Sequence, residues 1–406
     1  MKTIRFLGVW ICLVIGLALG AWSLRTPAPL PVDAPPTAFS AQRAMADVAA
    51  VAQAPHPTGS AQIAKVRDHL LTRMSELGLE VSVRPDQGFH ASAQNPRSLN
   101  VASVQNLAGV LPGTQRDLPA VLVMSHYDSV HNSPGAADDA AGVAAALEIA
   151  RALKAGGPAK RDVIFLFTDA EEAGLLGADA FFSRAPLAQR VGLVVNLEAR
   201  GDAGRAAMFQ TGPGNGALIS LYARAAQGPS ANSLASTVYA KMPNDTDFTH
   251  AVRKGLPGLN LAFIDDQLAY HTPLARADHL EKGSLQHVGD QVLPTIRALA
   301  DAAELPLATV RELSSIHEDG KLQCSVSVRH SDPAKLRSVY GELVNKAGDD
   351  PDLPVVSETS DNFISKLRIS VTPISATPGE SAQGFKAFDV AFLHDVVSRA
   401  AQSEWL

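Results

Sequence analysis

The feature of this sequence that most constrains its fold is a series of short apolar runs that alternate with longer segments of helical character. The runs are rich in branched residues, as buried strands are, and they occupy residues 119–126, 162–168, 192–197 and 257–265. Residues 138–157, between two of them, begin with acidic residues and end with glycines, which is typical of a helix. The alternation predicts an α/β fold in which a mostly parallel central sheet is flanked by helices.

Four regions are predicted along the chain of 406 residues. Residues 1–24 place two basic residues before an apolar stretch and indicate a signal anchor or a signal peptide. Residues 25–37 are a Pro-rich linker, and residues 38–305 contain the alternating strands and helices. Residues 306–406 differ in sequence pattern and predict a small α/β appendage of unknown role. It is a βαβα unit with strands at 323–329 and 365–374 and helices at 332–347 and 385–402.

Composition excludes several classes of protein. A net charge of -6 provides no basic surface for nucleic acid. The two cysteines, Cys12 and Cys324, do not make a disulfide framework, and without a CxxC pair any metal must bind to histidines and carboxylates. The basic residues before the apolar N-terminal stretch predict an extracytoplasmic protein, either membrane-anchored through that segment or secreted to the periplasm.

Histidine or acidic residues follow three of the apolar runs at their carboxyl ends. His126 ends the first run, Glu171 and Glu172 follow the second, and Glu198 follows the third. In open α/β sheets, sites form in the crevice beyond the carboxyl ends of the strands. We therefore expect these side chains to gather at one edge of the sheet.

Each of these motifs has two interpretations when it is taken alone. His126 is either a metal ligand oriented by Asp128, or a strand-end histidine beside a solvated acid. Asp138 and Asp139 open a helix, where capping explains one carboxylate. Two adjacent carboxylates repel each other unless a cation lies between them, and Asp138 would then be able to bridge two metals.

The acidic stretch at 169–174 is either a solvated loop or a site in which one glutamate binds metal and its neighbour accepts a proton from water. Glu198 is either a ligand or the ion-pair partner of a residue such as Arg200. Tyr270, which precedes His271, is able to donate its hydroxyl to an oxyanion, or the pair is structural.

The polar segment NDTDF at 244–248 makes Asx-type turns or forms the wall of a substrate pocket through Asn244 and Asp247. Taken together, the motifs supply two histidines and three carboxylates in the order His, Asp, Glu, Glu, His. Nitrogen and oxygen ligands of this kind suit two zinc ions.

The stretches HYDSV, PGAADDAAGV, FLFTDAEEAGLLGA, NLEARG, MPNDTDF and YHTP occur in this order. In them the sequence resembles the two-zinc aminopeptidase family, which includes secreted bacterial aminopeptidases, glutamate carboxypeptidases and glutaminyl cyclases. It is most similar to the vacuolar and endoplasmic-reticulum membrane metallopeptidases. The resemblance covers about residues 40–302 and makes residues 38–305 a zinc peptidase domain. Members of the membrane subgroup have several spanning segments, whereas this sequence shows one candidate.

The resemblance implies a role for each matching residue. Asp138 bridges the two zinc ions, Glu171 is the general base, Asp128 orients a ligand, and Tyr270 is an oxyanion donor. The other ligands are His126, Glu172, Glu198 and His271. The sequence departs from the family at Ala275, where the pattern H-T-x-x-D has Asp.

The function that this resemblance implies is exopeptidase action on the N-termini of peptides or proteins, with a metal-bridging water as nucleophile. Three alternatives stay open: a carboxypeptidase, in which Arg200 holds a substrate carboxylate; a glutaminyl-cyclase-like activity; and a non-catalytic binding ectodomain. The sequence gives no prediction for the oligomeric state.

Overall fold

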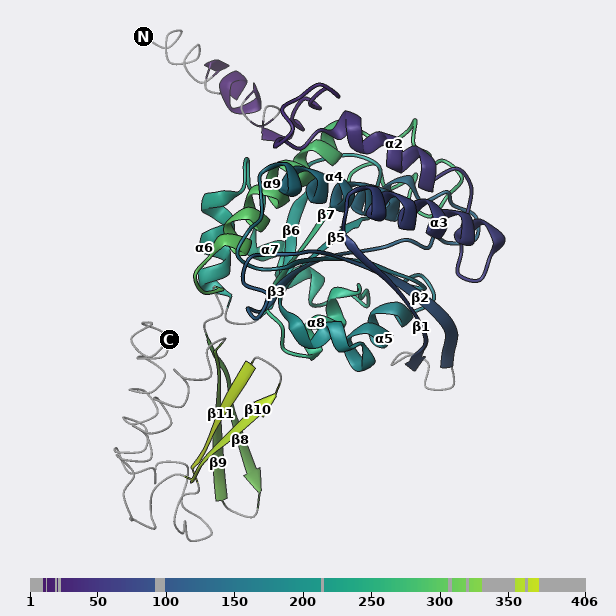
Figure 1. Cartoon of the computed structure of the whole chain (residues 1–406). Coiled ribbons are helices and arrows are strands. Elements are labelled where there is room, and N and C mark those ends of the chain that lie inside the picture. Colours follow the sequence, from purple (N-terminus) through teal and green to yellow (C-terminus); the bar gives the residue numbers. More distant parts are fainter. Residues whose placement is uncertain are drawn as a thin grey trace, which may run out of the picture.

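The structure is a computed structural model. The residues that it describes are 10–11, 13–18, 20, 23–91, 99–212, 215–305, 309–318, 321–330, 355–361 and 364–371. The main body contains a seven-stranded sheet with the strand order β1-β2-β4-β3-β5-β7-β6 (Figure 1). Its strands are β1 (Glu80–Ala91), β2 (Leu99–Leu111), β3 (Ala120–His126), β4 (Val163–Thr168), β5 (Val191–Ala199), β6 (Ala207–Thr211) and β7 (Gly258–Phe263).

The four central strands, β4, β3, β5 and β7, are parallel to one another, as the sequence predicts. The outer pairings β1–β2, β2–β4 and β6–β7 are antiparallel, so the whole sheet is mixed. This corrects the expectation of a mostly parallel sheet at its two sides. The long β1–β2 hairpin is half-exposed and carries many polar residues, so it lacks the continuous apolar run that marks the central strands.

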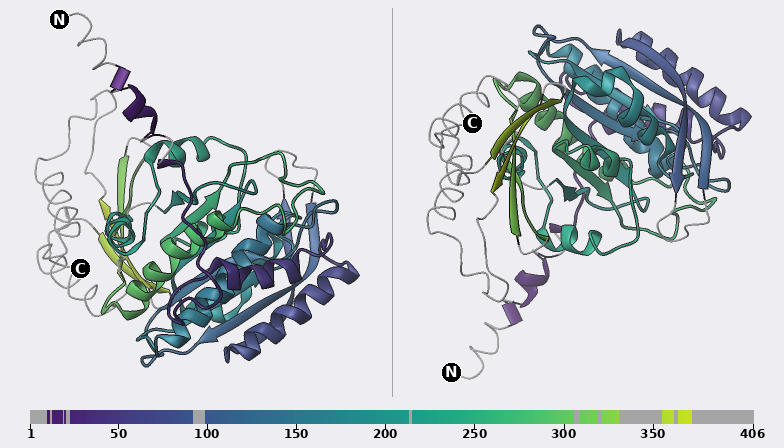
Figure 2. Two further views of the ribbon diagram at one scale, coloured as in Figure 1. Left: turned by 90° about the horizontal axis from the view of Figure 1, so that it is seen from above. Right: turned by 90° about the horizontal axis from the view of Figure 1, so that it is seen from below.

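Helices cover both faces of the sheet and make a three-layer α/β/α body. They are α2 (Ala41–Val51), α3 (Ala61–Glu76), α4 (Gly142–Ala155), α5 (Leu176–Arg184), α6 (Gly216–Ala225), α7 (Ser233–Tyr239), α8 (Phe248–Arg253) and α9 (Lys282–Asp301). Figures 1 and 2 show α2, α3, α4 and α9 over one face, with α5 and α8 against the other.

Burial on both faces of the sheet explains why residues 120–124 of strand β3 are all apolar. Val121 and Val123 pack into the core beneath α4 and α9, whereas Leu122 and Met124 pack into the core on the side of α5 and α8. Alternate residues of a strand point to opposite faces, and here both faces are covered. The same two-sided burial applies to β4, whose six residues are all buried.

A second, four-stranded antiparallel sheet has the order β10-β11-β9-β8. Its strands are β8 (Thr309–Glu318), β9 (Lys321–His330), β10 (Val355–Asp361) and β11 (Ile364–Val371). The sequence predicts β9 and β11 but not β8 or β10. The helices that it predicts at 332–347 and 385–402 lie outside the described residues, so the βαβα arrangement stays a prediction.

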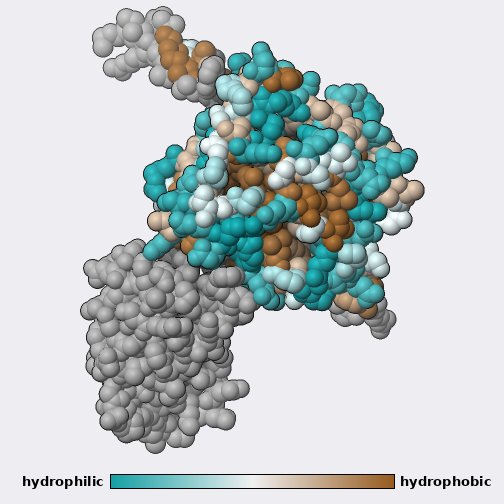
Figure 3. All heavy atoms as spheres, in the orientation of Figure 1, coloured by the Kyte–Doolittle hydropathy of each residue, from teal (hydrophilic) through white to brown (hydrophobic). Residues whose placement is uncertain are grey.

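The N-terminal segment is described only in part. Among the described residues, no helix has both the length and the apolar character needed to cross a bilayer. Residues 1–9, 12, 19, 21 and 22 lie outside the described set, and the anchor or signal predicted for 1–24 therefore stays a prediction. In Figure 3 the face of the main body is mainly hydrophilic, with apolar residues gathered between the helical layers.

Candidate functional site

The candidate site lies at the carboxyl edge of the parallel strands. His126 is the last residue of β3 and pairs with Thr168, the last residue of β4. Glu198 is the penultimate residue of the neighbouring strand β5. Because these strands run in the same direction, their carboxyl ends meet at one edge. The sheet register thus brings the residues that end these strands together, as expected from the sequence.

Five side chains converge at this edge around Asp138. One carboxylate oxygen of Asp138 lies 3.0 Å from His126 Nε2, and the other lies 2.9 Å from His271 Nε2. Glu172 Oε1 is 3.0 Å from His271 Nε2, and Glu198 Oε2 is 3.9 Å from His126 Nε2. Asp138 therefore lies between two histidines, each of which has a second carboxylate beside it.

The geometry defines three overlapping groups that could each hold a metal ion. Within each group, one ligand atom per residue lies within 4.8 Å of the others. The groups are His126, Asp138 and Glu198; Asp138, Glu172 and His271; and His126, Glu171 and Glu172. The first two share only Asp138, which is the arrangement that two ions bridged by one carboxylate require.

The polar atoms of the site fit this donor set. Glu172 Oε1 is buried beside His271 Nε2, and burial and the carboxylate of Asp138 raise the pKa of Glu172, while His271 opposes this. Burial also raises the pKa of Glu198 well above its usual range, as do Asp139 and Asp138, although His126 acts in the opposite direction. Carboxylates packed in this way repel one another unless a cation lies among them. Imidazole nitrogens and carboxylate oxygens at these spacings suit zinc.

The two adjacent aspartates divide their roles. Asp138 faces the histidines, whereas Asp139 Oδ1 accepts a hydrogen bond from the backbone N–H of Gly142 at 3.0 Å. A side chain at Gly142 would place its Cβ 2.4 Å from Asp139 Oδ1 and 2.7 Å from Ser125 Oγ. The glycine therefore leaves room for Asp139 to cap the helical segment. The capping interpretation fits Asp139, and the bridging interpretation of Asp138 stays a prediction.

Asp128 organises the loop that carries the two glutamates. Its carboxylate accepts the backbone N–H groups of Glu171 at 2.9 Å and of Glu172 at 3.2 Å. The nearest acceptor for His126 Nδ1 is the main-chain oxygen of Asp128 at 3.0 Å, and the carboxylate is 3.5 Å away. Asp128 thus orients the ring mainly through its backbone, and its side chain holds the loop.

Glu171 points into the group formed with His126 and Glu172. Burial raises its pKa well above the usual range, and the carboxylates of Glu198, Asp247 and Glu172 add to this, while His126 opposes it. A carboxyl group in such surroundings exchanges a proton near neutral pH more readily than an exposed one.

Tyr270 and His271 stack on each other, with ring centroids 3.7 Å apart and an interplanar angle of 17°. Burial raises the pKa of Tyr270, and the neighbouring carboxylates of Asp138 and Glu172 add to the effect, so the phenol stays protonated and can donate. Arg200 does not pair with Glu198; its guanidinium carbon lies 5.7 Å from the Tyr270 ring centroid. The carbonyl of Ala275 accepts a hydrogen bond from the backbone N–H of Ala136 at 3.1 Å. This bond holds the loop that carries Tyr270 and His271 beside Asp138.

Of the two predicted pocket-wall residues, Asp247 is 1% exposed and accepts a short hydrogen bond from Thr168 Oγ1. Burial raises its pKa to about 6. Asn244 is half-buried in the loop before α8 and makes no side-chain hydrogen bond within the described part of the chain. The structure thus gives Asp247 a supporting position beneath the site, and a substrate contact for either residue stays a prediction.

Sequence reasoning missed a buried polar layer behind the acidic loop. Asp169 Oδ1 accepts from Thr58 Oγ1 at 2.9 Å, and its Oδ2 accepts from the backbone of Gln105 at 2.9 Å. Burial raises the pKa of Tyr239, on α7; the carboxylates of Glu198 and Glu171 add to this, and Thr246 opposes it. Thr58 and Gln105 belong to no chemical motif, and only long-range packing identifies them.

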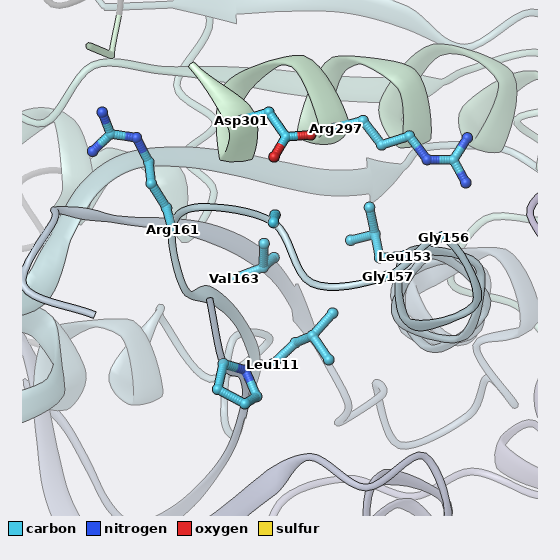
Figure 4. Close-up of a pocket in the computed structure, with 10 residues that line it drawn as sticks. Leu111, Leu153, Gly156, Gly157, Arg161, Val163, Arg297 and Asp301 are labelled. Atoms are coloured by element: carbon cyan, nitrogen blue, oxygen red, sulfur yellow. The ribbon is translucent and has the colours of Figure 1, made fainter. Parts of the chain in front are cut away.

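A small cavity of about 80 Å³ lies at the opposite edge of the sheet (Figure 4). Its charged neighbours are already engaged, since Arg161 donates to the carbonyl of Ala303 at 2.9 Å and Arg297 bonds to that of Ala152 at 3.2 Å. Both arginines therefore donate to the main chain, although Arg161 Nε has no hydrogen bond among the described residues, and we assign no function to this cavity.

The comparisons with known proteins concern the region that carries the site. Residues 106–296 match peptidase family M28. Endoplasmic reticulum metallopeptidase 1 of Mus musculus is 40% identical over 190 residues, which cover 46% of this chain and 21% of that protein. A vacuolar membrane protease of Schizosaccharomyces pombe is 30% identical over 281 residues, or 67% of this chain and 33% of that one. The matched part is thus about a fifth to a third of these relatives.

Among solved structures, an aminopeptidase from Aneurinibacillus sp. strain AM-1 superposes with a TM-score of 0.55 and 16% sequence identity. The superposition covers 68% of this chain and 96% of that one. At this sequence identity the similarity shows that the two chains share a fold. The shared fold extends over nearly the whole of that aminopeptidase chain.

Proposed function

We propose that this chain, whose residues 106–296 match peptidase family M28, is a two-zinc exopeptidase that removes residues from the N-termini of peptides. The observation that carries the proposal is the convergence of His126, His271 and three carboxylates on one edge of the sheet. One carboxylate oxygen of Asp138 lies beside His126 and the other lies beside His271. In this assignment the zinc ligands are His126, Asp138, Glu172, Glu198 and His271.

Zinc bound there supplies a Lewis acid that polarises the substrate carbonyl and activates water. Glu171 accepts the proton of the attacking water and then returns it to the leaving amine, a use that fits its raised pKa. Tyr270 donates its protonated hydroxyl to the oxygen of the substrate carbonyl as negative charge develops on it. The Asp128 carboxylate holds Glu171 and Glu172 in place by accepting hydrogen bonds from their backbone N–H groups.

The acidic lining favours a free α-amine at the scissile residue. The carboxylates of Glu198 and Asp247 lie close enough to Glu171 to raise its pKa, so acidic groups line the site. A substrate ammonium group is able to donate charge-assisted hydrogen bonds to such carboxylates, whereas a blocked N-terminus lacks that charge. This argument favours action on free N-termini over a blocked-substrate reaction. Cyclisation of an N-terminal glutamine also starts from a free α-amine, and release of an amino acid instead of ammonia distinguishes aminopeptidase action from it.

The test is a Glu171→Gln variant of the full chain, with zinc content and peptide turnover measured on the same preparation. We expect about two zinc ions per chain in both proteins, since Glu171 is not one of the five ligands. Removing a general base of this kind lowers kcat by about 10²- to 10⁴-fold. Full turnover in the variant would refute the base assignment, and zinc-free wild-type protein would favour the non-catalytic binding module.

We also propose residues 38–305 as the catalytic domain and an extracytoplasmic location for it, because basic residues precede the apolar stretch in 1–24. A reporter fused after residue 37 that is active only outside the cytoplasm tests this placement. Activity of the fusion inside the cytoplasm contradicts it.

A further inference from the structure

Arg200 is a half-buried cation at the rim of the candidate site, two residues beyond Glu198. Its backbone N–H donates to the carbonyl of Phe263 at 3.0 Å, so the pairing of β5 with β7 fixes its main chain. Within the described residues, its guanidinium makes no hydrogen bond and has no carboxylate within 4.0 Å, and its one recorded contact is the ring of Tyr270. This absence of a partner is notable because the site beside it is rich in carboxylates.

The contact with Tyr270 leaves the hydrogen-bonding groups of Arg200 available. A guanidinium that lies over an aromatic ring uses its face, whereas its N–H groups lie in its plane and point outward. Those N–H groups form a fork that matches the two oxygens of a carboxylate. Tyr270 therefore supports the side chain from one side and leaves its donor edge free for a ligand.

The reach of this fork is set by two distances. The Arg200 guanidinium carbon lies 5.7 Å from the Tyr270 ring centroid, which lies 3.7 Å from the His271 ring centroid. As two sides of a triangle, these distances place the guanidinium within about 10 Å of the His271 ring. An extended peptide spans at most about 3.3 to 3.6 Å per residue. A carboxylate two or three residues along a bound peptide can therefore reach Arg200.

The loop that carries Tyr270 also exposes apolar side chains at this rim. Leu268 is 84% exposed, Ile264 is 52% exposed and Leu274 is 49% exposed. Large apolar residues on one short segment are suited to cover the side chains of a peptide that lies across it. The rim thus combines apolar surface for side chains with one unpaired cation for an anionic group.

We propose that Arg200 binds the C-terminal carboxylate of di- and tripeptides whose scissile bond lies at the cation site. This inference rests on the proposed function and names its substrate class: short peptides with a free carboxylate. An acidic side chain next to the scissile bond offers the same chemistry, and the experiment separates the two sources. In the competing structural explanation, Arg200 only holds Tyr270 in place.

The experiment compares wild-type enzyme with Arg200→Met, which keeps the length of the side chain, and with Arg200→Lys, which keeps the charge but not the fork. Arg276→Met is the matched control. Arg276 lies shortly after the Tyr270 loop in the sequence and is already paired with Asp278 at 3.0 Å. The substrates are Ala-Ala, Ala-Ala-amide and Ala-Asp-amide. Binding of reduced-bond analogues of the same three peptides, measured by calorimetry, provides a readout that does not depend on turnover.

We expect Arg200→Met to lower the ratio of kcat/KM for Ala-Ala over Ala-Ala-amide by about 10- to 100-fold, the effect of losing a hydrogen bond to a charged group. Arg200→Lys is expected to give an intermediate ratio, because it retains the charge alone. The Arg276→Met control is expected to retain the wild-type ratio. The affinity ratio of the analogues should change in parallel.

An equal loss on all three peptides supports the structural explanation and overturns the inference. A ratio that changes only for Ala-Asp-amide assigns Arg200 to an acidic side chain and also overturns the C-terminal assignment. If the wild-type enzyme hydrolyses none of the peptides, the proposed exopeptidase function fails. The affinity ratio of the analogues then decides the carboxylate site independently.

Discussion

Replacing Asp128 by Asn separates the positioning of the glutamate loop from metal binding. The Asp128 carboxylate is 1% exposed and accepts the backbone N–H groups of Glu171 and Glu172, one on each oxygen. An amide keeps one acceptor and turns an NH₂ group toward the other N–H. The variant thus loses one charge-assisted hydrogen bond, which contributes about 1.5 to 3 kcal/mol, and leaves a buried donor without an acceptor.

We therefore expect the free energy of unfolding to fall by about 2 to 3 kcal/mol, which lowers Tm by roughly 4 to 10 °C in a domain of this size. Because the displaced loop carries the proposed base, kcat should also fall by about 10- to 100-fold. The assay is peptide turnover normalised to zinc content, with thermal unfolding measured on the same samples. Normalisation matters because the Asp128 carboxylate also lies 3.5 Å from His126 Nδ1.

Asp169→Asn is the matched control, because Asp169 is also buried and also accepts a backbone N–H, that of Gln105. It does not bond to either glutamate of the loop. We expect the control to lose stability with much less loss of kcat per zinc. Equal values of kcat for Asp128→Asn and wild type, at equal zinc content, would refute the positioning role.

Three further predictions concern the scaffold and the metal. Gly142→Ala should lower the free energy of unfolding by about 1 to 3 kcal/mol in thermal melts, because the added methyl would lie 2.4 Å from a carboxylate oxygen, whereas Gly216→Ala, with open space around it, should be neutral or stabilising. Burial of Asp47 acts against its charged form, but hydrogen bonds from His69 and Arg73 outweigh this and lower its pKa. The folded-state pKa is thus below the unfolded value of about 3.9, so this stabilisation is present above that pH and is lost as pH falls through the folded pKa. Urea titrations between pH 3 and 6 should show a smaller acid-side loss of stability in Asp47→Asn, and an unchanged pH dependence contradicts the assignment. Finally, dialysis against a zinc chelator should abolish turnover and lower Tm, and added zinc should restore both, because the carboxylates of the site repel one another without a cation; full activity after metal removal contradicts a metallopeptidase.

The sequence predicts the parts of the fold that local patterns determine. The runs that become β3, β4, β5 and β7 are apolar because both faces of each strand are buried, and this leaves a continuous signal. The hairpin β1–β2 and the edge strand β6 are only partly buried, so their sequences lack that signal. Antiparallel pairing at the edges depends on long-range contacts that no short stretch of sequence contains.

The candidate site is predictable to a different extent. The family resemblance is confirmed, and it selects the residues that the structure brings together around Asp138. The sequence predicts that one of the two adjacent aspartates caps the helix but not that it is Asp139, and it does not reveal that Asp128 holds the glutamate loop through backbone N–H groups. Nor does it predict that Arg200 contacts Tyr270 instead of Glu198. Such partners depend on directions of individual side chains, which follow only from the packed structure.

The position of His271 in the sequence has a consequence for when the proposed metal site is able to form. Its imidazole meets Asp138 and Glu172, although more than 130 residues separate it from Asp138 along the chain. A growing polypeptide that has not yet extended past residue 271 lacks one of the two histidines. The proposed set of metal ligands is therefore complete only after the last part of the domain has been synthesised and the loop of His271 has docked beside Asp138.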